Sequence, residues 1–339
     1  MTRPSARRAV RLGMATVLLS AVTAIGVIAQ SRPLRLVSTV WPPFTNVAGQ
    51  PRFALDLVEA AFERLGVTAA TAFVEASEFT PAVLTGPFDG SAAVWKDPDR
   101  ERALIFSQPY LENRLILVAR RGGDVSATAF TALKGRRIAV VEGYAYGDAV
   151  DNAGPVLVRS KSEEDSLKLL LDGKADYTLM DELVVNYILD NYATEARTRL
   201  QIATAPLLTR PLHLAVRRSL PNAQSIVDRF NAQLRTMVTD RTYHRLLHTD
   251  WIRADIDGDG LAEYVSASDK SGKTPPAHAY RLFSPESIDK QVKQEQERYF
   301  FNGAIYNGWS SVPDRYKVDD LGRTDAQHPT ARVFTFSWK

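Results

Sequence analysis

The 339-residue chain contains no cysteine, which excludes disulfide bonds, thiolate-bound zinc and a cysteine nucleophile. Histidine is also scarce, at five residues, and the positions match neither a metal site nor a catalytic triad. Only His244 and His248 lie four residues apart, and without a third ligand we interpret them as part of a solvated helix face. The composition, 45% hydrophobic and 24% charged, is that of a folded globular protein, and the length predicts two lobes with additional chain.

Negative charge is missing from the first 29 residues, which carry four arginines and no acid. An uncharged run from Leu12 to Ala29 follows these arginines and ends in the small residue Ala29. A positive start, an apolar run and small residues at its end are typical of a secretory signal peptide. We therefore expect residues 1–29 to be a cleaved Sec signal peptide that directs the protein to the periplasm. The alternative is an uncleaved membrane anchor, because the run is just long enough to span a bilayer.

The basic excess of the chain belongs to this leader. Without its four arginines, the 42 basic residues become 38 against 39 acidic ones, so the net charge changes from +3 to −1. No dense basic stripe remains that could follow a phosphate backbone. The sequence therefore predicts that nucleic acid is not a partner.

Short β-rich runs alternate with helix-compatible segments between residues 34 and 238, a pattern that predicts an α/β fold with a mostly parallel sheet. Two continuous apolar runs, Leu115–Arg120 and Leu212–Arg217, have the character of buried strands. Because they bracket a middle α/β unit, we expect them to cross between two lobes as a two-strand hinge. Such a hinge lets the lobes close over a cleft.

This organisation divides the chain into five parts. We expect the signal peptide at 1–29, the first part of lobe 1 at 30–118, lobe 2 at 119–207, the return to lobe 1 at 208–250, and an acidic loop with a C-terminal extension at 251–339. Within the extension, residues 265–279 have the composition of a linker, and the aromatic-rich end of the chain is expected to be ordered. The residues of the extension define no role for it.

Several short motifs share the order and spacing of one known family. They are Trp41-Pro42-Pro43-Phe44, Asp97-Pro98-Asp99-Arg100, Phe106-Ser107-Gln108-Pro109-Tyr110, Leu133-Lys134-Gly135, and Gly173-Lys174-Ala175-Asp176 followed by Met180-Asp181. Together they resemble the family-3 extracellular solute-binding proteins, the periplasmic receptors of ABC transporters for polar amino acids. The resemblance covers about residues 34–250 and implies a two-lobed periplasmic-binding-protein fold of type II, with the C-terminal extension added.

The resemblance implies a monomeric periplasmic protein that captures a small amino-acid-like ligand by lobe closure. It would deliver the ligand to an ABC transporter permease in the inner membrane, with no catalytic residues and no organic cofactor. Two alternatives stay open. The same fold carries enzymes such as cyclohexadienyl dehydratases, and the extension fits a periplasmic sensor or partner-binding protein.

Two charged residues fit the capture of an amino acid, whose charges must both be paired when they leave water. Arg100 offers a planar fork of donors for a carboxylate, and Asp181, in the other lobe, can accept hydrogen bonds from an ammonium group. The alternatives are a surface ion pair of Arg100 with Asp97 or Glu101, and a role for Asp181 as the N-cap of a helix at 182–191.

Four aromatic residues are also expected in the cleft. The chain has Ala93 and Trp95 where the family commonly has hydroxyl residues, and Tyr144 where a threonine often follows the glycine of lobe 2. With Trp41 and Phe44 of the opening motif, these rings can hold an apolar side chain or a cation. The loss of hydroxyls weakens the assignment of an α-amino acid. The alternative is that the rings are core or lobe-contact residues.

An acidic loop follows the solute-binding core. Asp255, Asp257 and Asp259 alternate, a glycine follows, and Glu263 stands at the ninth position, so their oxygens can surround a calcium ion. The twelfth position is Ser266, so the loop is not a full EF-hand and resembles the short calcium loops of dockerin and integrin-type repeats. We expect a structural calcium site here; the alternative is an acidic Asp-Gly turn.

Overall fold

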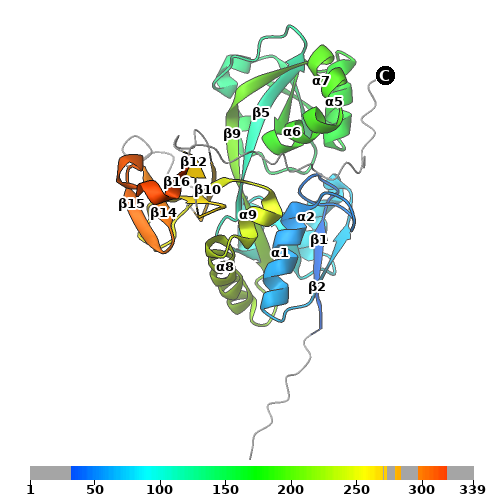
Figure 1. Ribbon diagram of the computed structural model, residues 1–339. Helices are drawn as coiled ribbons and strands as arrows, with labels where there is room; N and C mark the ends of the chain where they lie inside the picture. Colours follow the sequence, from blue (N-terminus) through cyan, green and yellow to red (C-terminus); the bar gives the residue numbers. More distant parts are fainter. Residues whose placement is uncertain (1–31, 270, 273–278, 284–296, 319–339) are drawn as a thin grey trace, which may run out of the picture. The chain divides into compact units, whose positions relative to one another are not determined.

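The computed structural model describes residues 32–269, 271–272, 279–283 and 297–318 (Figure 1). The predicted signal peptide, part of the predicted linker and the aromatic-rich end of the chain lie outside these residues. The chain divides into two units, Met1–Arg32 and Pro33–Lys339, and every described helix and strand belongs to the second unit.

A nine-stranded sheet connects the two lobes in the order β2–β1–β3–β9–β5–β8–β6–β7, with β4 paired to β9. Its strands are β1 Leu34–Ser38, β2 Ala69–Phe73, β3 Gly90–Val94, β4 Leu104–Phe106, β5 Leu111–Arg120, β6 Arg137–Val141, β7 Val156–Ser160, β8 Tyr177–Asp181 and β9 Leu200–Arg217. The predicted parallel pairing holds at both edges, in β1–β2 and β6–β7. The centre is antiparallel, because β5 and β9 run between the lobes in opposite directions.

The helices of lobe 1 flank its half of the sheet. They are α1 Phe53–Arg64, α2 Ala76–Thr85, α3 Pro98–Ala103, α8 Ala223–Thr239 and α9 Thr242–Leu247. In α1 the helical spacing of apolar residues buries Leu55, Val58 and Phe62 almost completely. The helix stops before Gly66, whose positive φ of 65° suits glycine.

The helices of lobe 2 are α4 Asp148–Asp151, α5 Glu163–Leu171, α6 Glu182–Asn191 and α7 Ala193–Arg199. The Ser162 side chain caps α5 by accepting a hydrogen bond from the backbone N–H of Asp165 at 3.1 Å. The short helix α4 begins after Gly147, which adopts a φ of 87°. Ahead of that turn, the Tyr146 hydroxyl accepts a hydrogen bond from the backbone of Val141, so its ring lies in the core.

The hinge consists of β5 and β9, which pair antiparallel from Leu111–Leu212 to Arg120–Leu200. The two predicted apolar runs are the buried parts of these longer strands. The pairing register shifts beside Ile116, so the ladder is irregular near the middle of β5. The chain therefore has the two-lobed architecture with a two-strand hinge that the sequence predicted.

The C-terminal extension forms its own five-stranded sheet, in the order β13–β10–β11–β14–β15, where β14 and β15 are the orange hairpin of Figure 1. Its strands are β10 Trp251–Ala254, β11 Glu263–Ser266, β13 Tyr280–Leu282, β14 Arg298–Phe301 and β15 Ala304–Asn307. A small second sheet pairs β12, Ser271–Gly272, with β16, Lys317–Val318. The helical turns η4 Trp309–Ser311 and η5 Asp314–Tyr316 complete the described part of the extension.

The extension shares the main hydrophobic core of the protein. Leu282 and Phe283 are 0% and 4% exposed and belong to the same buried cluster as the helices of lobe 1. The backbone N–H of Phe283 donates to the carbonyl of Pro109, just ahead of the hinge strand β5, at 2.9 Å. A separate aromatic cluster within the extension includes Tyr264, Tyr299 and Phe301.

His244 also joins α9 to the extension, because its ring nitrogen Nε2 lies 3.1 Å from the carbonyl oxygen of Val265 in β11. The side chain is 2% exposed, and burial lowers its pKa. The interpretation of this histidine as a solvated helix residue is therefore wrong. The polar partner that makes its burial possible lies 21 residues further along the chain.

Among the described residues, no helix is both long enough and apolar enough to cross a membrane.

Candidate ligand-binding cleft

Four of the predicted cleft residues line one cavity at the junction of the lobes. They are Trp41, Trp95, Arg100 and Tyr144. The cavity also has Phe79 from lobe 1 and Gly143 from lobe 2 in its wall, and its volume is about 30 Å³. That is roughly the share of one water molecule in liquid water, about 30 Å³. The structure is therefore a closed conformation, without room for an amino acid.

Aromatic rings fill the space between the lobes. Trp41 lies with its ring centroid 5.6 Å from Trp95 and 5.6 Å from Tyr144, both in edge-to-face geometry. Phe44 lies 4.2 Å from Trp41 on its other side and is fully buried against Phe53, so it supports Trp41 from the core. Trp41 and Trp95 are 6% and 5% exposed. These rings occupy the cleft itself, so a ligand can enter only if they move.

Arg100 joins the two lobes. Its Nη1 donates to the carbonyl of Trp95 at 3.0 Å, and its Nη2 donates to the Thr80 hydroxyl at 2.8 Å. The same Nη2 donates to the carbonyl of Gly143 in lobe 2 at 3.1 Å. Asp97 lies 3.0 Å from Nε, and burial lowers the pKa of the guanidinium while the Asp97 charge opposes this shift. In the closed form these protein partners occupy most of the arginine's donors.

Asp181 stands at the end of β8 and caps helix α6, as its Oδ1 accepts the backbone N–H of Leu183 at 2.7 Å. Its Oδ2 accepts from the Asn113 side-chain amide at 3.0 Å. Asn113 in turn accepts from the indole N–H of Trp95 at 2.7 Å, so a buried hydrogen-bonded chain runs from lobe 1 through the hinge to lobe 2. The pKa of Asp181 is raised to about 7, chiefly by burial.

Glu163 is a cleft residue that the sequence did not identify. It is the first residue of α5, and its Oε2 is buried without a hydrogen bond from any described residue. It lines a second cavity of about 30 Å³ together with Trp41. Burial, and then the charge of Asp181, raise its pKa to about 8, against the opposing effect of the Trp41 indole. Acids are common in the first turn of a helix, so no sequence signal distinguished this one.

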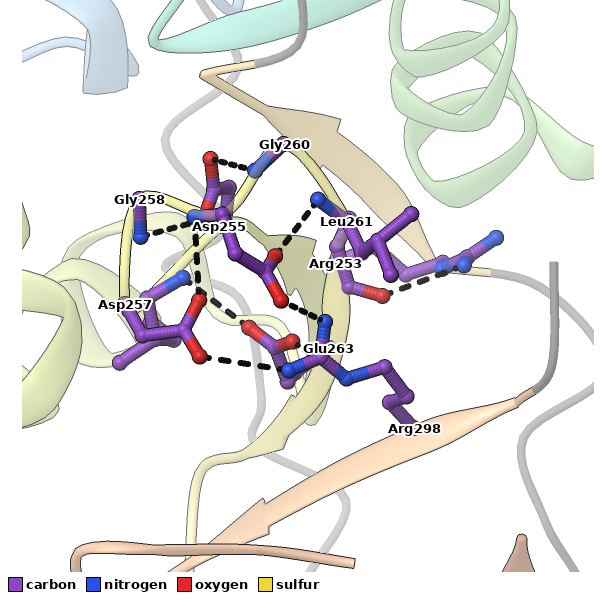
Figure 2. Close-up of polar contacts among 11 residues, drawn as sticks. Arg253, Asp255, Asp257, Gly258, Gly260, Leu261, Glu263 and Arg298 are labelled. Atoms are coloured by element: carbon purple, nitrogen blue, oxygen red, sulfur yellow. Dashed lines mark hydrogen bonds and ion pairs between the residues drawn. The ribbon is translucent and has the colours of Figure 1, made fainter. Parts of the chain in front are cut away.

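The acidic loop encloses an arginine from the extension (Figure 2). The Arg298 guanidinium of β14 lies 3.3 Å from Asp257, 2.7 Å from Asp259 and 3.1 Å from Glu263. One oxygen each of Asp255, Asp257 and Glu263 also lie within 4.8 Å of one another. These three hard oxygen donors fit a calcium ion, and Asp259 does not belong to this close group; Arg298 pairs with Asp257, Asp259 and Glu263 alike.

Backbone contacts hold the loop in shape. The Asp255 carboxylate accepts the backbone N–H groups of Gly258 at 2.6 Å and Gly260 at 3.1 Å (Figure 2). Glu263, which is fully buried, accepts the N–H of Ile256 at 3.0 Å. Gly258 and Gly260 both have a positive φ, which a glycine adopts without strain. The loop is thus a fixed turn between β10 and β11.

The chain belongs to the bacterial extracellular solute-binding proteins, family 3, whose model matches residues 36–254. It is 28% identical over 130 residues to the virulence sensor protein BvgS of Bordetella bronchiseptica, and 25% identical over 155 residues to BvgS of Bordetella pertussis. These stretches cover 38% and 45% of this chain. The matches span only 10% and 12% of the length of those curated relatives.

Among solved structures, an ancestral arginine-binding protein bound to arginine superposes with a TM-score of 0.54 at 23% identity, covering 64% of this chain and 96% of that one. The ligand-binding core of GluR0 from Nostoc punctiforme, in complex with L-glutamate, has a TM-score of 0.53 at 20% identity, covering 63% and 97%. These likenesses establish the two-lobed fold of type II. The family and both structures are binding proteins.

Proposed function

We propose that the protein is a periplasmic solute-binding protein that captures a small amino-acid-like ligand and delivers it to an ABC transporter permease in the inner membrane. The observation that carries this proposal is the meeting of Arg100 and three aromatic rings in one cavity where the lobes join, with Asp181 connected to Trp95 through Asn113. Family membership and amino-acid-bound structural neighbours support it. A ligand that replaces contacts between the lobes favours one lobe arrangement over the other, which is the requirement for ligand-driven closure.

A thermal-shift screen of the mature protein tests this proposal. Amino acids, opines and polyamines are each added to the purified protein, and titration calorimetry follows any compound that raises the melting temperature. Reversible stabilisation by a single class of solute supports the proposal. Absence of stabilisation by all of these compounds would contradict it. Loss of uptake of the identified solute in cells that lack the protein would test delivery to a permease.

A second candidate function is that of a periplasmic sensor, and one observation favours it. The Tyr280 hydroxyl of the extension donates to Glu182 of lobe 2 at 2.9 Å, directly beside Asp181. Arg114 of the hinge strand donates to the carbonyl of Ala279 at 2.7 Å, and its guanidinium lies 4.3 Å from the Tyr280 ring. The extension therefore contacts the hinge and the moving lobe together, and the likeness to BvgS agrees with this role.

Amide hydrogen exchange distinguishes the sensor function from the transport function. If the extension responds to the cleft, a ligand that binds between the lobes should change the amide protection of β10 and β11, far from the ligand itself. Unchanged protection there, with clear protection in β8 and α6, would exclude the sensor role. We propose no enzymatic activity, and incubation with prephenate, followed by product analysis, tests that assignment.

We propose that residues 1–29 are removed on export through the Sec pathway. Support comes from the leader composition and from the extracellular family to which the chain belongs. Cell fractionation and N-terminal sequencing should find a periplasmic protein that begins at Gln30. A membrane-bound chain with the leader intact would contradict the proposal. We also expect this mature protein to sediment as a monomer.

We further propose that the acidic loop binds a structural calcium ion through Asp255, Asp257 and Glu263. Calcium is expected to raise the melting temperature of the mature protein, and a chelator to reverse the effect. In the double variant Asp255→Asn, Asp257→Asn the response to calcium should disappear, because two of the three charged ligands are lost. Equal melting temperatures of the native protein in calcium and in chelator would contradict a calcium site.

A further inference from the structure

Two acids of the cleft, the buried Asp181 and the half-buried Glu163, have no cationic partner among the described residues. Asp181 is 1% exposed, and its carboxylate accepts hydrogen bonds from the neutral groups of Leu183 and Asn113. Glu163 has its Oε2 buried without a hydrogen bond from the described chain. None of the ion pairs between described residues includes either acid. Buried carboxylates without a counter-charge are unfavourable, so this pair marks a place for a cation.

The arginines of lobe 1 do not supply that charge. Arg100 is held by Asp97 and by the carbonyl groups of Trp95 and Gly143. Arg210 donates to the carbonyl of Lys96 at 2.5 Å. Because Arg100 uses its donors to join the lobes, it is not free in this conformation to grip a carboxylate with two parallel hydrogen bonds.

Aromatic faces surround the same space. Trp41 lines both small cavities, the one beside Arg100 and the one beside Glu163, so that a displacement of its indole ring would join them. Tyr144 lies 5.6 Å from Trp41 and 5.5 Å from Trp95. Electron-rich rings beside carboxylates form the usual protein environment for ammonium and guanidinium groups.

We infer that the ligand is a small organic cation, whose ammonium or guanidinium group binds Asp181 and Glu163 of lobe 2 and the face of Trp41 of lobe 1, and that a carboxylate on the ligand is not required. This inference rests on the proposed solute-binding function. It makes Glu163 a ligand-binding residue and assigns Arg100 to lobe closure. Burial raises the pKa of both acids in the empty cleft, and a bound cation reverses that shift.

The test is titration calorimetry on the full mature protein with agmatine, putrescine, arginine and glutamate. Agmatine and putrescine carry cationic groups and no carboxylate. We expect both to bind, and agmatine to bind at least as tightly as arginine. Binding of arginine or glutamate without binding of agmatine and putrescine overturns the inference and leaves the solute-binding function standing. Binding of none of the four, and of no other amino compound, contradicts the proposed function itself.

Two isosteric variants locate the site. Glu163→Gln should weaken the affinity for agmatine by about tenfold or more, since a desolvated charge pair is lost. The matched control is Asp165→Asn, which removes the same charge from the first turn of α5 at a residue that lines neither cavity, and should bind agmatine like the native protein. Equal affinities of native protein and Glu163→Gln would overturn the role of Glu163. Far-ultraviolet circular dichroism and melting of the unliganded variants confirm that both are folded.

Discussion

At the scale of single residues, the sequence identifies only one of the two acids of the cleft. Glu163 opens helix α5 like many other acids, and only the tertiary contact with Trp41 and Asp181 makes it unusual. Asp181, in contrast, could be predicted both as a cleft acid and as a helix cap, and one carboxylate oxygen is available for each task. A residue that two sequence patterns identify is easier to predict than one whose role depends on contacts with residues distant in the sequence.

The two cleft acids should destabilise the unliganded protein as pH rises from about 6.5 to about 8; below about pH 6.5 the buried His213 and His244, whose pKa values burial lowers, act in the opposite direction. Burial raises the folded-state pKa of Glu163 to about 8 and of Asp181 to about 7, so across this window the folded state binds more protons than the unfolded chain. Each acid can contribute a slope of at most about 1.4 kcal/mol per pH unit. Tyr144, Tyr146, Glu182 and Arg114 are the other titratable groups whose charge or backbone acts on the pair.

Thermal melting of the native protein and of Glu163→Gln, in buffers between about pH 6.5 and about pH 9, measures this effect. The melting temperature of the native protein should fall more steeply than that of the variant, which lacks one of the two acids. Parallel curves would show that Glu163 is as easily ionised in the folded state as in the unfolded chain.

Arg100 and Arg102 lie two residues apart in α3 but in opposite environments. Arg100→Ala should destabilise the protein by about 3 kcal/mol, because it leaves the half-buried Asp97 unpaired and removes the bonds to both lobes. Arg102 is 72% exposed in its side chain and pairs only with the equally exposed Asp99, so Arg102→Ala should change stability by less than about 0.5 kcal/mol. Urea denaturation compares the two variants, and equal losses would refute the assigned role of Arg100.

At the scale of elements, a glycine stands where the backbones of the two lobes lie close together. A Cβ atom on Gly143 of lobe 2 would lie 2.4 Å from the carbonyl oxygen of Ala76 in lobe 1, and the same glycine accepts the hydrogen bond from Arg100. Because this contact is between two backbone segments, a change of side-chain rotamer cannot relieve the clash. Closure therefore depends on the absence of a side chain at this position.

Gly143→Ala should shift the protein toward open lobes. The matched control is Gly135→Ala, where φ is similar, 74° against 81°, but an added Cβ meets nothing within 4 Å. Both variants share the strain of alanine at positive φ, whereas only Gly143→Ala creates the clash. Tryptophan fluorescence should move to longer wavelength in Gly143→Ala, as Trp41 and Trp95 become exposed, and small-angle scattering should give a larger radius of gyration. Identical spectra and radii for the two variants would contradict this.

The hinge and the extension show which strands local sequence patterns can predict and which they cannot. The apolar runs in β5 and β9 predicted two buried crossing strands, because a buried strand needs a continuous apolar sequence. The same reasoning did not predict the sheet of the extension. Its strands are short, and two of its pairings, β10 with β13 and β11 with β14, are parallel and join segments that are far apart in the sequence. The polar composition around residue 270 predicted a linker, although β12 and β13 lie in and beside it.

At the scale of the whole molecule, Tyr280 offers a way to measure whether the extension follows the lobes. Tyr280→Phe removes the hydroxyl that donates to Glu182 and keeps the ring over Arg114, so the expected loss of stability is about 1 kcal/mol. If the protein is a sensor, this variant should also lose the ligand-dependent change in amide protection of β10 and β11, while the cleft still binds ligand.

The matched control is Tyr299→Phe, which removes a comparable hydroxyl bond, to Glu297, entirely within the extension. It should leave the response to ligand intact in the same hydrogen-exchange experiment. A response that survives in Tyr280→Phe, or that disappears equally in both variants, would argue against Tyr280 as the connection between lobe 2 and the extension.

The burial of Phe283 in the main core determines where the chain can be truncated. The family match ends at residue 254, yet Leu282 and Phe283 fill the core that the solute-binding lobes share. A chain truncated at residue 254, where the family match ends, would leave an exposed apolar surface beside Pro109. We expect this truncated chain to aggregate. The described strands continue to Val318, so the folded structure extends well beyond the residues that the family model matches.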